Sequence, residues 1–225
     1  MMKKIAVILL ALLLVLPAAV WADEPLVGGW TPAEDFTVTE ERQAVFDKGL
    51  EMLVGVDYVP VAYLGSQVVA GTNHVFLVKG TVVVPNAPVS YALVYLYQDL
   101  QGGVTLMNIA DMPIIPQEDG AVAPVTEELM GGWFYADDPA VTEEIQARLD
   151  KALEGLVGAT YVPVANLGEQ VVAGLNRCLL CQVTPVVPDA RPHYALVYVY
   201  EQLDGGAELG KVIDLDVGAL CTYGA

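Results

Sequence analysis

The stretch QVVAG at residues 67–71 occurs again at residues 170–174, and an asparagine follows two places later in both copies (Asn73 and Asn176). Five small or apolar residues can recur by chance in any chain rich in strand-forming residues. These two copies, however, lie 103 residues apart (170 against 67), and the same shift superimposes much of the remaining sequence. QVVAG therefore marks the register of a larger similarity within the chain.

Four further segments match at this shift without a gap. They are GGW at 28 and 131, VTEE at 38 and 141, YVPVA at 58 and 161, and YALVY at 91 and 194. Self-similarity at a constant shift indicates an internal duplication, and each copy has the size of a small domain. We expect a first domain at residues 23–112, a proline-containing linker at 113–127 and a second domain at 128–225.

The remaining residues, 1–22, have the pattern of a secretory signal peptide. Two lysines precede an apolar run from Ile5 to Val20, and small residues stand before Asp23. An uncleaved membrane anchor is the alternative, but the run is shorter than the ~20 residues that a membrane span needs. We expect cleavage near Ala22 and a protein that is secreted, or periplasmic in a bacterium.

The chain is strongly acidic, with 28 Asp and Glu against 10 Lys and Arg and a net charge of −18. Cleavage would also remove Lys3 and Lys4, which changes the net charge to about −20. Because contacts to phosphate groups need Lys and Arg, this balance argues against nucleic acid and against an anionic membrane as partners. Acidity of this size keeps an exported protein soluble, or attracts a basic partner.

Each copy predicts one helix followed by four strands. In the second copy, Thr142 and two glutamates suit a helix start, and the apolar residues that follow have helical spacing: Ile145, Leu149, Ala152, Leu153 and Leu156. The first copy repeats this pattern less cleanly at Thr39, Phe46, Leu50 and Leu53. Val- and Tyr-rich segments punctuated by Gly and Pro follow, as strands do. The expected fold class is α+β, with an antiparallel sheet and one helix across its face in each unit.

Tyrosines recur at alternate positions of the predicted strands. They stand at 91, 95 and 97 in the first copy and at 194, 198 and 200 in the second. Residues at alternate positions of a strand share one face. We expect these rings to pack on a sheet face rather than to form a binding surface.

Gly-Gly ahead of a helix, a central QVVAG-x-N and a final Leu-x-Gly-Gly hairpin resemble the cystatin superfamily of cysteine-protease inhibitors, and the stefin branch in particular. The first copy contains LVGGW and QVVAGTN, and the second contains LMGGW and QVVAGLN. The resemblance covers each repeat almost from end to end. It implies two tandem cystatin-like domains, each an antiparallel sheet wrapped around one α-helix.

The resemblance also implies a function, the reversible inhibition of papain-like (cathepsin-type) cysteine proteases, with up to two proteases per chain. Three segments of each repeat would enter the active-site cleft, where glycine and alanine keep the backbone thin and valine and leucine supply apolar contact. The protease-binding residues implied in the first repeat are Leu26, Val27, Gly28, Gly29, Gln67, Val68, Val69, Ala70, Gly71, Leu100, Gln101 and Gly102. Those in the second repeat are Leu129, Met130, Gly131, Gly132, Gln170, Val171, Val172, Ala173, Gly174, Leu203, Asp204 and Gly205.

The sequence does not favour an enzyme. His74 and His193 are the only histidines, and the equivalent positions hold Arg177 and Ser90, which argues against a duplicated His-based catalytic or metal site. No nucleophile–base pair and no glycine-rich phosphate loop is visible, so we expect no catalytic residues, no metal and no cofactor. The alternative to inhibition is a non-inhibitory binding module that retains the QVVAG loop because it folds well.

All three cysteines lie in the second repeat, at Cys178, Cys181 and Cys221. The first two are three residues apart on a predicted strand, so they point to opposite faces and suit a metal poorly. In an exported protein we expect Cys221 to form a disulfide with Cys178 or with Cys181, and the sequence leaves the choice open. Stefins usually lack an export signal and stand alone, and secreted cystatins have two disulfides per domain, so the chain departs from both branches.

Overall fold

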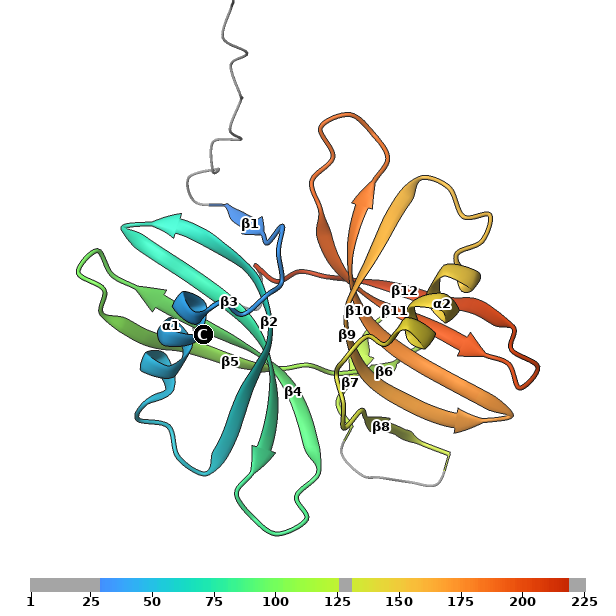
Figure 1. Cartoon of the computed structure of the whole chain (residues 1–225), viewed down its shortest axis with the longest axis horizontal. Helices are drawn as coiled ribbons and strands as arrows, with labels where there is room; N and C mark the ends of the chain where they lie inside the picture. The colour runs from blue at the N-terminus through green and yellow to red at the C-terminus, as the bar shows by residue number, and fades with distance from the viewer. Residues whose placement is uncertain (1–28, 126–130, 219–225) are drawn as a thin grey trace, which may run out of the picture.

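The structure is a computed structural model that describes residues 29–125 and 131–218. It contains two five-stranded antiparallel sheets, one from each repeat, and a separate two-stranded sheet (Figure 1). The strands of the first sheet follow chain order, β1-β2-β3-β4-β5. Their bounds are β1 (Trp30–Pro32), β2 (Val56–Val69), β3 (Gly71–Val82), β4 (Val89–Gln98) and β5 (Val104–Asp111).

The second sheet repeats this order in the second repeat, as β8-β9-β10-β11-β12. Its strands are β8 (Trp133–Tyr135), β9 (Ala159–Val172), β10 (Gly174–Pro185), β11 (His193–Glu201) and β12 (Ala207–Leu215). The two short strands between the sheets, β6 (Ile115–Pro116) and β7 (Val122–Ala123), pair with each other. They lie within residues 113–127, the segment expected to be a linker. The residue just before β6, Ile114, is fully buried.

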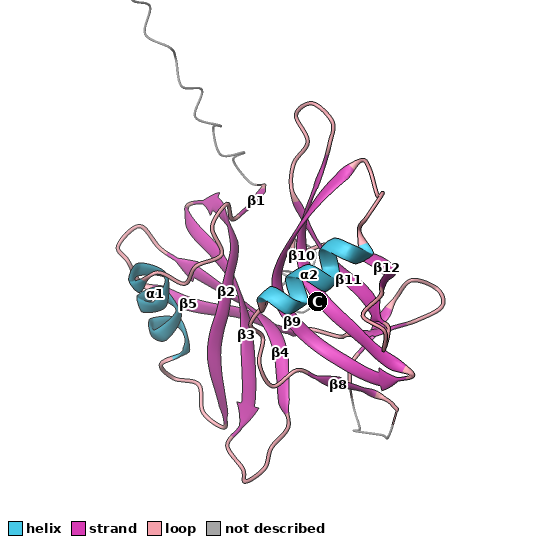
Figure 2. Ribbon diagram, turned by 45° about the vertical axis from the view of Figure 1, so that its right-hand side comes forward, coloured by secondary structure: helices cyan, strands magenta, loops and turns pink. Residues whose placement is uncertain are grey.

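One helix accompanies each five-stranded sheet: α1 (Glu40–Leu50) in the first repeat and α2 (Glu143–Ala152) in the second (Figure 2). The expected N-caps are confirmed, because the Thr39 hydroxyl accepts the Arg42 amide and the Thr142 hydroxyl accepts the Ile145 amide, both at 3.3 Å. These bonds satisfy amides that the helix itself leaves without a partner. Both helices are shorter than the apolar spacing predicted.

The expected fold class, α+β with two tandem cystatin-like domains each wrapped around a helix, is wrong. The part of the chain that the structure describes is mostly β, with 51% of residues in strands and 11% in helices. The reason is that each sheet buries both faces. On β3, Phe76 and Val78 pack under α1, whereas Val75 and Leu77 face the other sheet. The largest buried cluster therefore lies between the two sheets rather than beneath the helices.

The core between the sheets is built by equivalent residues of both repeats. Leu93 and Tyr95 of β4 meet Leu196 and Tyr198 of β11 in one cluster. As expected, the tyrosines at 91, 95, 194 and 198 are buried and pack on sheet faces, and those at 97 and 200 are partly buried. Each buried ring also hydrogen-bonds to the other repeat, which the sequence did not indicate.

Two of these tyrosine hydrogen bonds obey the shift of 103 residues. Tyr95 Oη donates to the carbonyl oxygen of Val217 at 2.8 Å, and Tyr198 Oη donates to that of Ile114 at 3.0 Å. Position 198 corresponds to 95 and position 217 to 114, so the two bonds are equivalent by an approximate twofold relation. Tyr91 and Tyr194 also donate to carbonyls of the other repeat, those of Ala136 and Leu64, but these two acceptors are not equivalent, because position 136 corresponds to 33. The segment that follows the last strand of each repeat thus packs on the sheet of the other.

No helix within the described ranges is long and apolar enough to cross a membrane. The expected signal segment, residues 1–22, lies outside the described residues and its cleavage stays a prediction.

Candidate functional site

In each repeat, the expected binding segments meet at one end of the sheet. In the first repeat, Trp30 pairs with Gln67 of the QVVAG hairpin, and Thr72, just past its tip, pairs with Gln98. Gln98 in turn pairs with Val104 across the last hairpin, residues 99–103. The three segments therefore lie side by side in the order of the strands. We call residues 29, 67–71 and 100–103 the first edge, and residues 131–132, 170–174 and 203–206 the second edge.

The outer residues of the QVVAG-x-N stretch hold the hairpin together. Asn73 Nδ2 donates to Gln67 Oε1 at 2.7 Å, and Asn176 Nδ2 donates to Gln170 Oε1 at 2.8 Å. In the second repeat Gln170 Nε2 also donates to the carbonyl of Gly131 at 2.9 Å, which ties the segment before β8 to the hairpin. The glutamine and the asparagine are therefore explained by hairpin geometry.

The glycine at each hairpin tip is required by the backbone. Gly71 has a φ of +134° and Gly174 a φ of +138°, a region that favours glycine. A Cβ at Gly71 would also lie 2.4 Å from the carbonyl oxygen of Gln98. The adjacent carbonyl, that of Ala70, accepts the Tyr97 hydroxyl at 2.5 Å. Tyr200 makes the equivalent bond to Ala173 at 2.6 Å. Sequence reasoning missed this role of Tyr97 and Tyr200, although their recurrence in both copies was visible.

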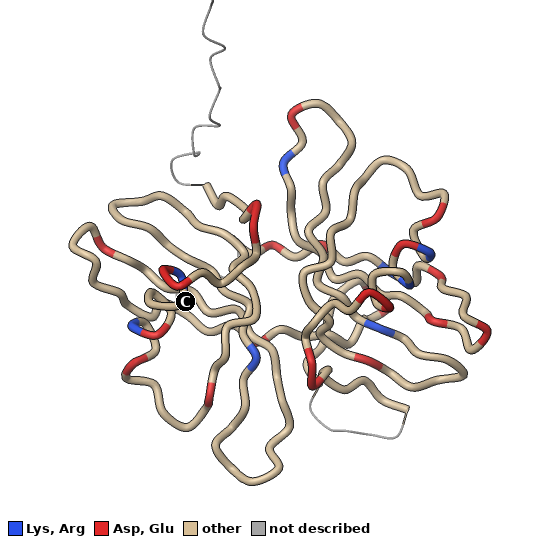
Figure 3. Tube along the Cα trace, viewed as in Figure 1, with Lys and Arg blue, Asp and Glu red and all other residues tan. Residues whose placement is uncertain are grey.

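The side chains between these structural positions are free to contact a partner. Val69 and Val172 are each 41% exposed, and Val68 and Val171 are exposed beside them. At the last hairpins, Leu100 and Leu203 are 80% and 88% exposed. Each edge thus presents two valines and one leucine that the fold does not bury. The hairpin tips from 68 to 72 and from 171 to 175 contain no charged residue, although acidic residues are spread over both repeats (Figure 3).

The last hairpins are connected to the helices by basic side chains. Lys48 Nζ of α1 donates to the carbonyl of Gly102 at 2.7 Å. Arg148 Nη1 of α2 donates to the carbonyl of Gly205 at 2.5 Å. Sequence reasoning also missed these residues, whose partners lie more than 50 positions away in the chain. Both bonds restrict the position of the exposed leucine relative to its sheet.

Several expected site residues lie outside the described ranges: Leu26, Val27 and Gly28 before the first sheet, and Leu129 and Met130 before the second. Their contribution stays a prediction. Gly29, Gly131 and Gly132 are described, and each adjoins the first strand of its sheet.

The two edges face away from each other. Figure 1 shows the β2–β3 and β4–β5 hairpins at the upper left of the molecule and the β9–β10 and β11–β12 hairpins at its right. This placement follows from the approximate twofold relation between the sheets.

The cysteines and histidines take structural positions. Cys178 lies in the core between the sheets and Cys181 in the core beneath α2, so the two thiols point to opposite faces as expected. Both are buried and not joined to each other, whereas Cys221 lies outside the described residues. His74 Nδ1 lies 3.0 Å from the Tyr63 hydroxyl, and burial lowers the pKa of His74. The described residues include no group of three or more His, Cys, Asp or Glu arranged to hold a metal ion.

Comparison of the chain with protein-family models finds no match, and comparison with curated proteins finds none either.

Proposed function

We propose that this chain is a reversible inhibitor of papain-like cysteine proteases, with two binding edges, and that it acts after export from the cytoplasm. The observation that carries the proposal is that the strand after the Gly-Gly pair, the QVVAG hairpin and the last hairpin lie side by side at one end of each sheet. Alternate hairpins of an antiparallel sheet whose strands follow chain order lie at the same end, so the placement of the two hairpins follows from the strand order. The pairing of Trp30 with Gln67 and of Trp133 with Gln170 brings the segment after the glycines to the same end.

The chemistry of each edge also supports the proposal. Exposed apolar side chains on a rigid hairpin bind a cleft with little loss of conformational entropy. Val68, Val69 and Leu100 have this character, and their hairpins are held by the Asn73, Tyr97 and Lys48 hydrogen bonds. Since the two edges face away from each other, two proteases can bind one chain at once.

A specific observation favours a second candidate function, a non-inhibitory binding module. Gln67, Ala70, Gly71 and Asn73 all have roles within the hairpin itself. The repetition of QVVAG-x-N is therefore explained by the folding of the hairpin and is not by itself evidence that the hairpin binds a protease. The exposed valines and leucines are the residues that distinguish the two functions.

The test is to titrate papain with the full chain and measure residual activity. We expect a break at two proteases per chain. Val69→Asp and Val172→Asp each place a charge on an exposed, uncharged tip, so each should raise the inhibition constant of its own edge roughly 30-fold or more, as expected for a central contact residue. The double variant should lose tight inhibition.

The matched controls lie at the opposite end of each sheet. Val83 and Val186 are equivalent by the repeat and are exposed like the edge valines. Val83→Asp and Val186→Asp should leave inhibition unchanged. Absence of tight inhibition by the unaltered chain would favour the non-inhibitory module. Persistence of tight inhibition in the double variant at positions 69 and 172 would contradict binding through the two edges.

A further inference from the structure

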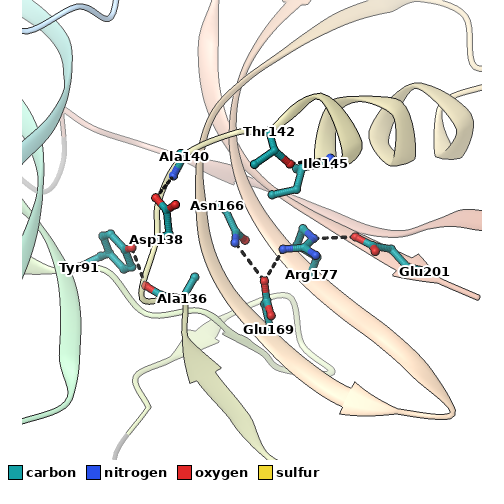
Figure 4. Close-up of polar contacts among 10 residues, drawn as sticks. All are labelled: Tyr91, Ala136, Asp138, Ala140, Thr142, Ile145, Asn166, Glu169, Arg177 and Glu201. Atoms are coloured by element: carbon teal, nitrogen blue, oxygen red, sulfur yellow. Dashed lines mark hydrogen bonds and ion pairs between the residues drawn. The ribbon is translucent and has the colours of Figure 1, made fainter.

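The second repeat contains a pocket that the first repeat fills. It has a volume of about 340 Å³ and lies between the N-terminus of α2, the segment 136–140 and strands β9 and β10. Its polar walls include Asp137, Asp138, Asn166, Glu169 and Arg177, and Ala140 and Ile145 add apolar surface. Figure 4 shows Asn166, Glu169 and Arg177 converging between the sheet and the start of the helix.

Two substitutions between the repeats open this pocket. In the first repeat, Tyr63 is buried at the equivalent of Asn166, and the Arg42 guanidinium, at the equivalent of Ile145, lies 4.0 Å from the centre of the Tyr63 ring. A tyrosine ring and an arginine thus occupy the space between helix and sheet. In the second repeat the shorter side chains of Asn166 and Ile145 occupy these positions, so the pocket remains open between helix and sheet.

The pocket contains a buried acceptor that has no partner among the described residues. Asn166 is 3% exposed, and its Nδ2 donates to Glu169 Oε1 at 3.1 Å. Its Oδ1 makes no hydrogen bond within the described part of the chain. The opposite orientation of the amide would place Oδ1 against the Glu169 carboxylate, so the hydrogen-bond network fixes the oxygen as the unpartnered atom. A buried carbonyl oxygen without a donor is unfavourable, and a ligand that donates an N–H would satisfy it.

The charges around this acceptor favour a cation. Arg177 pairs with both Glu169 and Glu201, which leaves one negative charge in excess within a half-buried group. Asp137 and Asp138 add two more carboxylates, and the nearby Lys79 ammonium donates to the carbonyl of Asp137. Helix α2 begins at the pocket, and the partial positive charge of its N-terminus disfavours a bound cation. Its Ile145 amide, however, is capped by Thr142, and its first turn contains Glu143 and Glu144.

We propose that this pocket binds a small organic cation with several N–H donors, an alkyl ammonium or guanidinium compound. One N–H would donate to Asn166 Oδ1, the charge would lie near Asp138 and Glu169, and the alkyl body would contact Ile145 and Ala140. This site is separate from the two edges and does not depend on protease inhibition.

The probe is 1,4-diaminobutane, added to the ¹⁵N-labelled full chain at constant ionic strength and followed by amide chemical shifts. We expect saturable shifts at Ala140, Ile145, Asn166 and Arg177. The equivalent amides of the first repeat, Thr37, Arg42, Tyr63 and His74, serve as the internal control and should stay unchanged. Tetramethylammonium, which has the same type of charge without an N–H, should not produce the shifts.

Two variants test the geometry. Asn166→Tyr places the first-repeat residue in the pocket and should weaken binding at least about tenfold, the loss of one hydrogen bond to a charged group. Asp138 accepts the Ala140 amide at 2.9 Å. Asp138→Asn retains an oxygen that can accept this amide and removes one negative charge. It should weaken binding severalfold even if Asn166→Tyr does not fold.

The proposal is overturned by equal shifts in both repeats, by equal shifts with tetramethylammonium, or by unchanged affinity in Asp138→Asn. Shifts at the same amides with sodium acetate but not with the diamine would assign the pocket to an anion instead.

Discussion

At the scale of single residues, the QVVAG-x-N stretch divides into two kinds of position. Gln67, Gly71 and Asn73 serve the hairpin, through a cross-strand hydrogen bond and a backbone conformation that favours glycine. Val68 and Val69 make no side-chain hydrogen bond and are exposed, so part of each side chain is available to a partner. Replacement of Gly71 by a bulky residue would therefore disturb β3 and β4 before it disturbed any partner, so the valines are the residues on which function should be tested.

Cys178 leads to a prediction about thiol reactivity and alkaline pH. Burial raises the pKa of its thiol from 9.0 to about 12. A thiolate is the reactive form, so in a Cys221→Ser variant the native chain should not react with a thiol reagent at pH 8, whereas the denatured chain should release two thiols. One thiol in the denatured unaltered chain would indicate the expected disulfide of Cys221, and three would contradict it.

The raised pKa of Cys178 also determines how the stability of the fold changes with pH. A thiol whose pKa is raised on folding stabilises the fold fully below about pH 9, and this contribution is lost as the pH rises toward 12. Buried Tyr91, Tyr194 and Tyr198 have raised pKa values for the same reason, desolvation by burial. The free energy of unfolding, measured in urea, should therefore fall above pH 9. A constant value up to pH 11 would contradict the burial of these groups.

At the scale of elements, the helices show how closely local sequence and structure agree. A threonine followed by two glutamates, at Thr39 and at Thr142, predicts the N-caps, and both caps form. The helix ends were harder to predict, because the apolar spacing continues through Leu153 to Leu156 although α2 ends at Ala152. The spacing of apolar residues shows which side chains would share a helix face, but it does not show where the helix ends. Helix α2 ends where the turn before β9 begins.

The cap of α2 can be tested by substitution. Thr142→Ala removes the acceptor of the Ile145 amide and should lower the free energy of unfolding by about 1 kcal/mol. Thr142→Ser retains a hydroxyl at the same place and should change the free energy of unfolding much less. Urea denaturation followed by circular dichroism measures both. Equal destabilisation by the two substitutions would show that the methyl group, rather than the hydrogen bond, stabilises this helix start.

At the scale of the whole molecule, the two repeats share a core and should unfold together. Leu93 is fully buried between the sheets. Leu93→Ala should lower the free energy of unfolding by about 2–5 kcal/mol, the usual result of creating a cavity in a core. Hydrogen exchange should show loss of protection in the second repeat as well as in the first.

The matched control for this prediction is Val83→Ala, an exposed position in the turn after β3, which should change little. Loss of protection confined to residues 29–111 would mean that the repeats fold independently. The shared core also has a practical consequence. The first repeat alone would expose the apolar face of Leu93 and Tyr95, and the second alone that of Leu196 and Tyr198, so inhibition is best measured on the full chain.

The linear order of residues determined the duplication, the strands, the helix starts and the residues of the QVVAG hairpin, because all of these depend on local spacing or on identity at a constant shift. An unbroken apolar run such as YALVYLY at residues 91–97 also contained the signal that both faces of β4 are covered. The second face of β4 and that of β11 are each covered by the other repeat, through contacts such as those of Tyr95 with Val217 and of Tyr198 with Ile114. Residues so distant in the chain leave no local pattern in the sequence. Only the tertiary structure decided that two sheets share one core, that their edges face apart, and that exchanging Tyr63 for Asn166 opens a pocket, because these depend on how the two repeats and their side chains fill the same space.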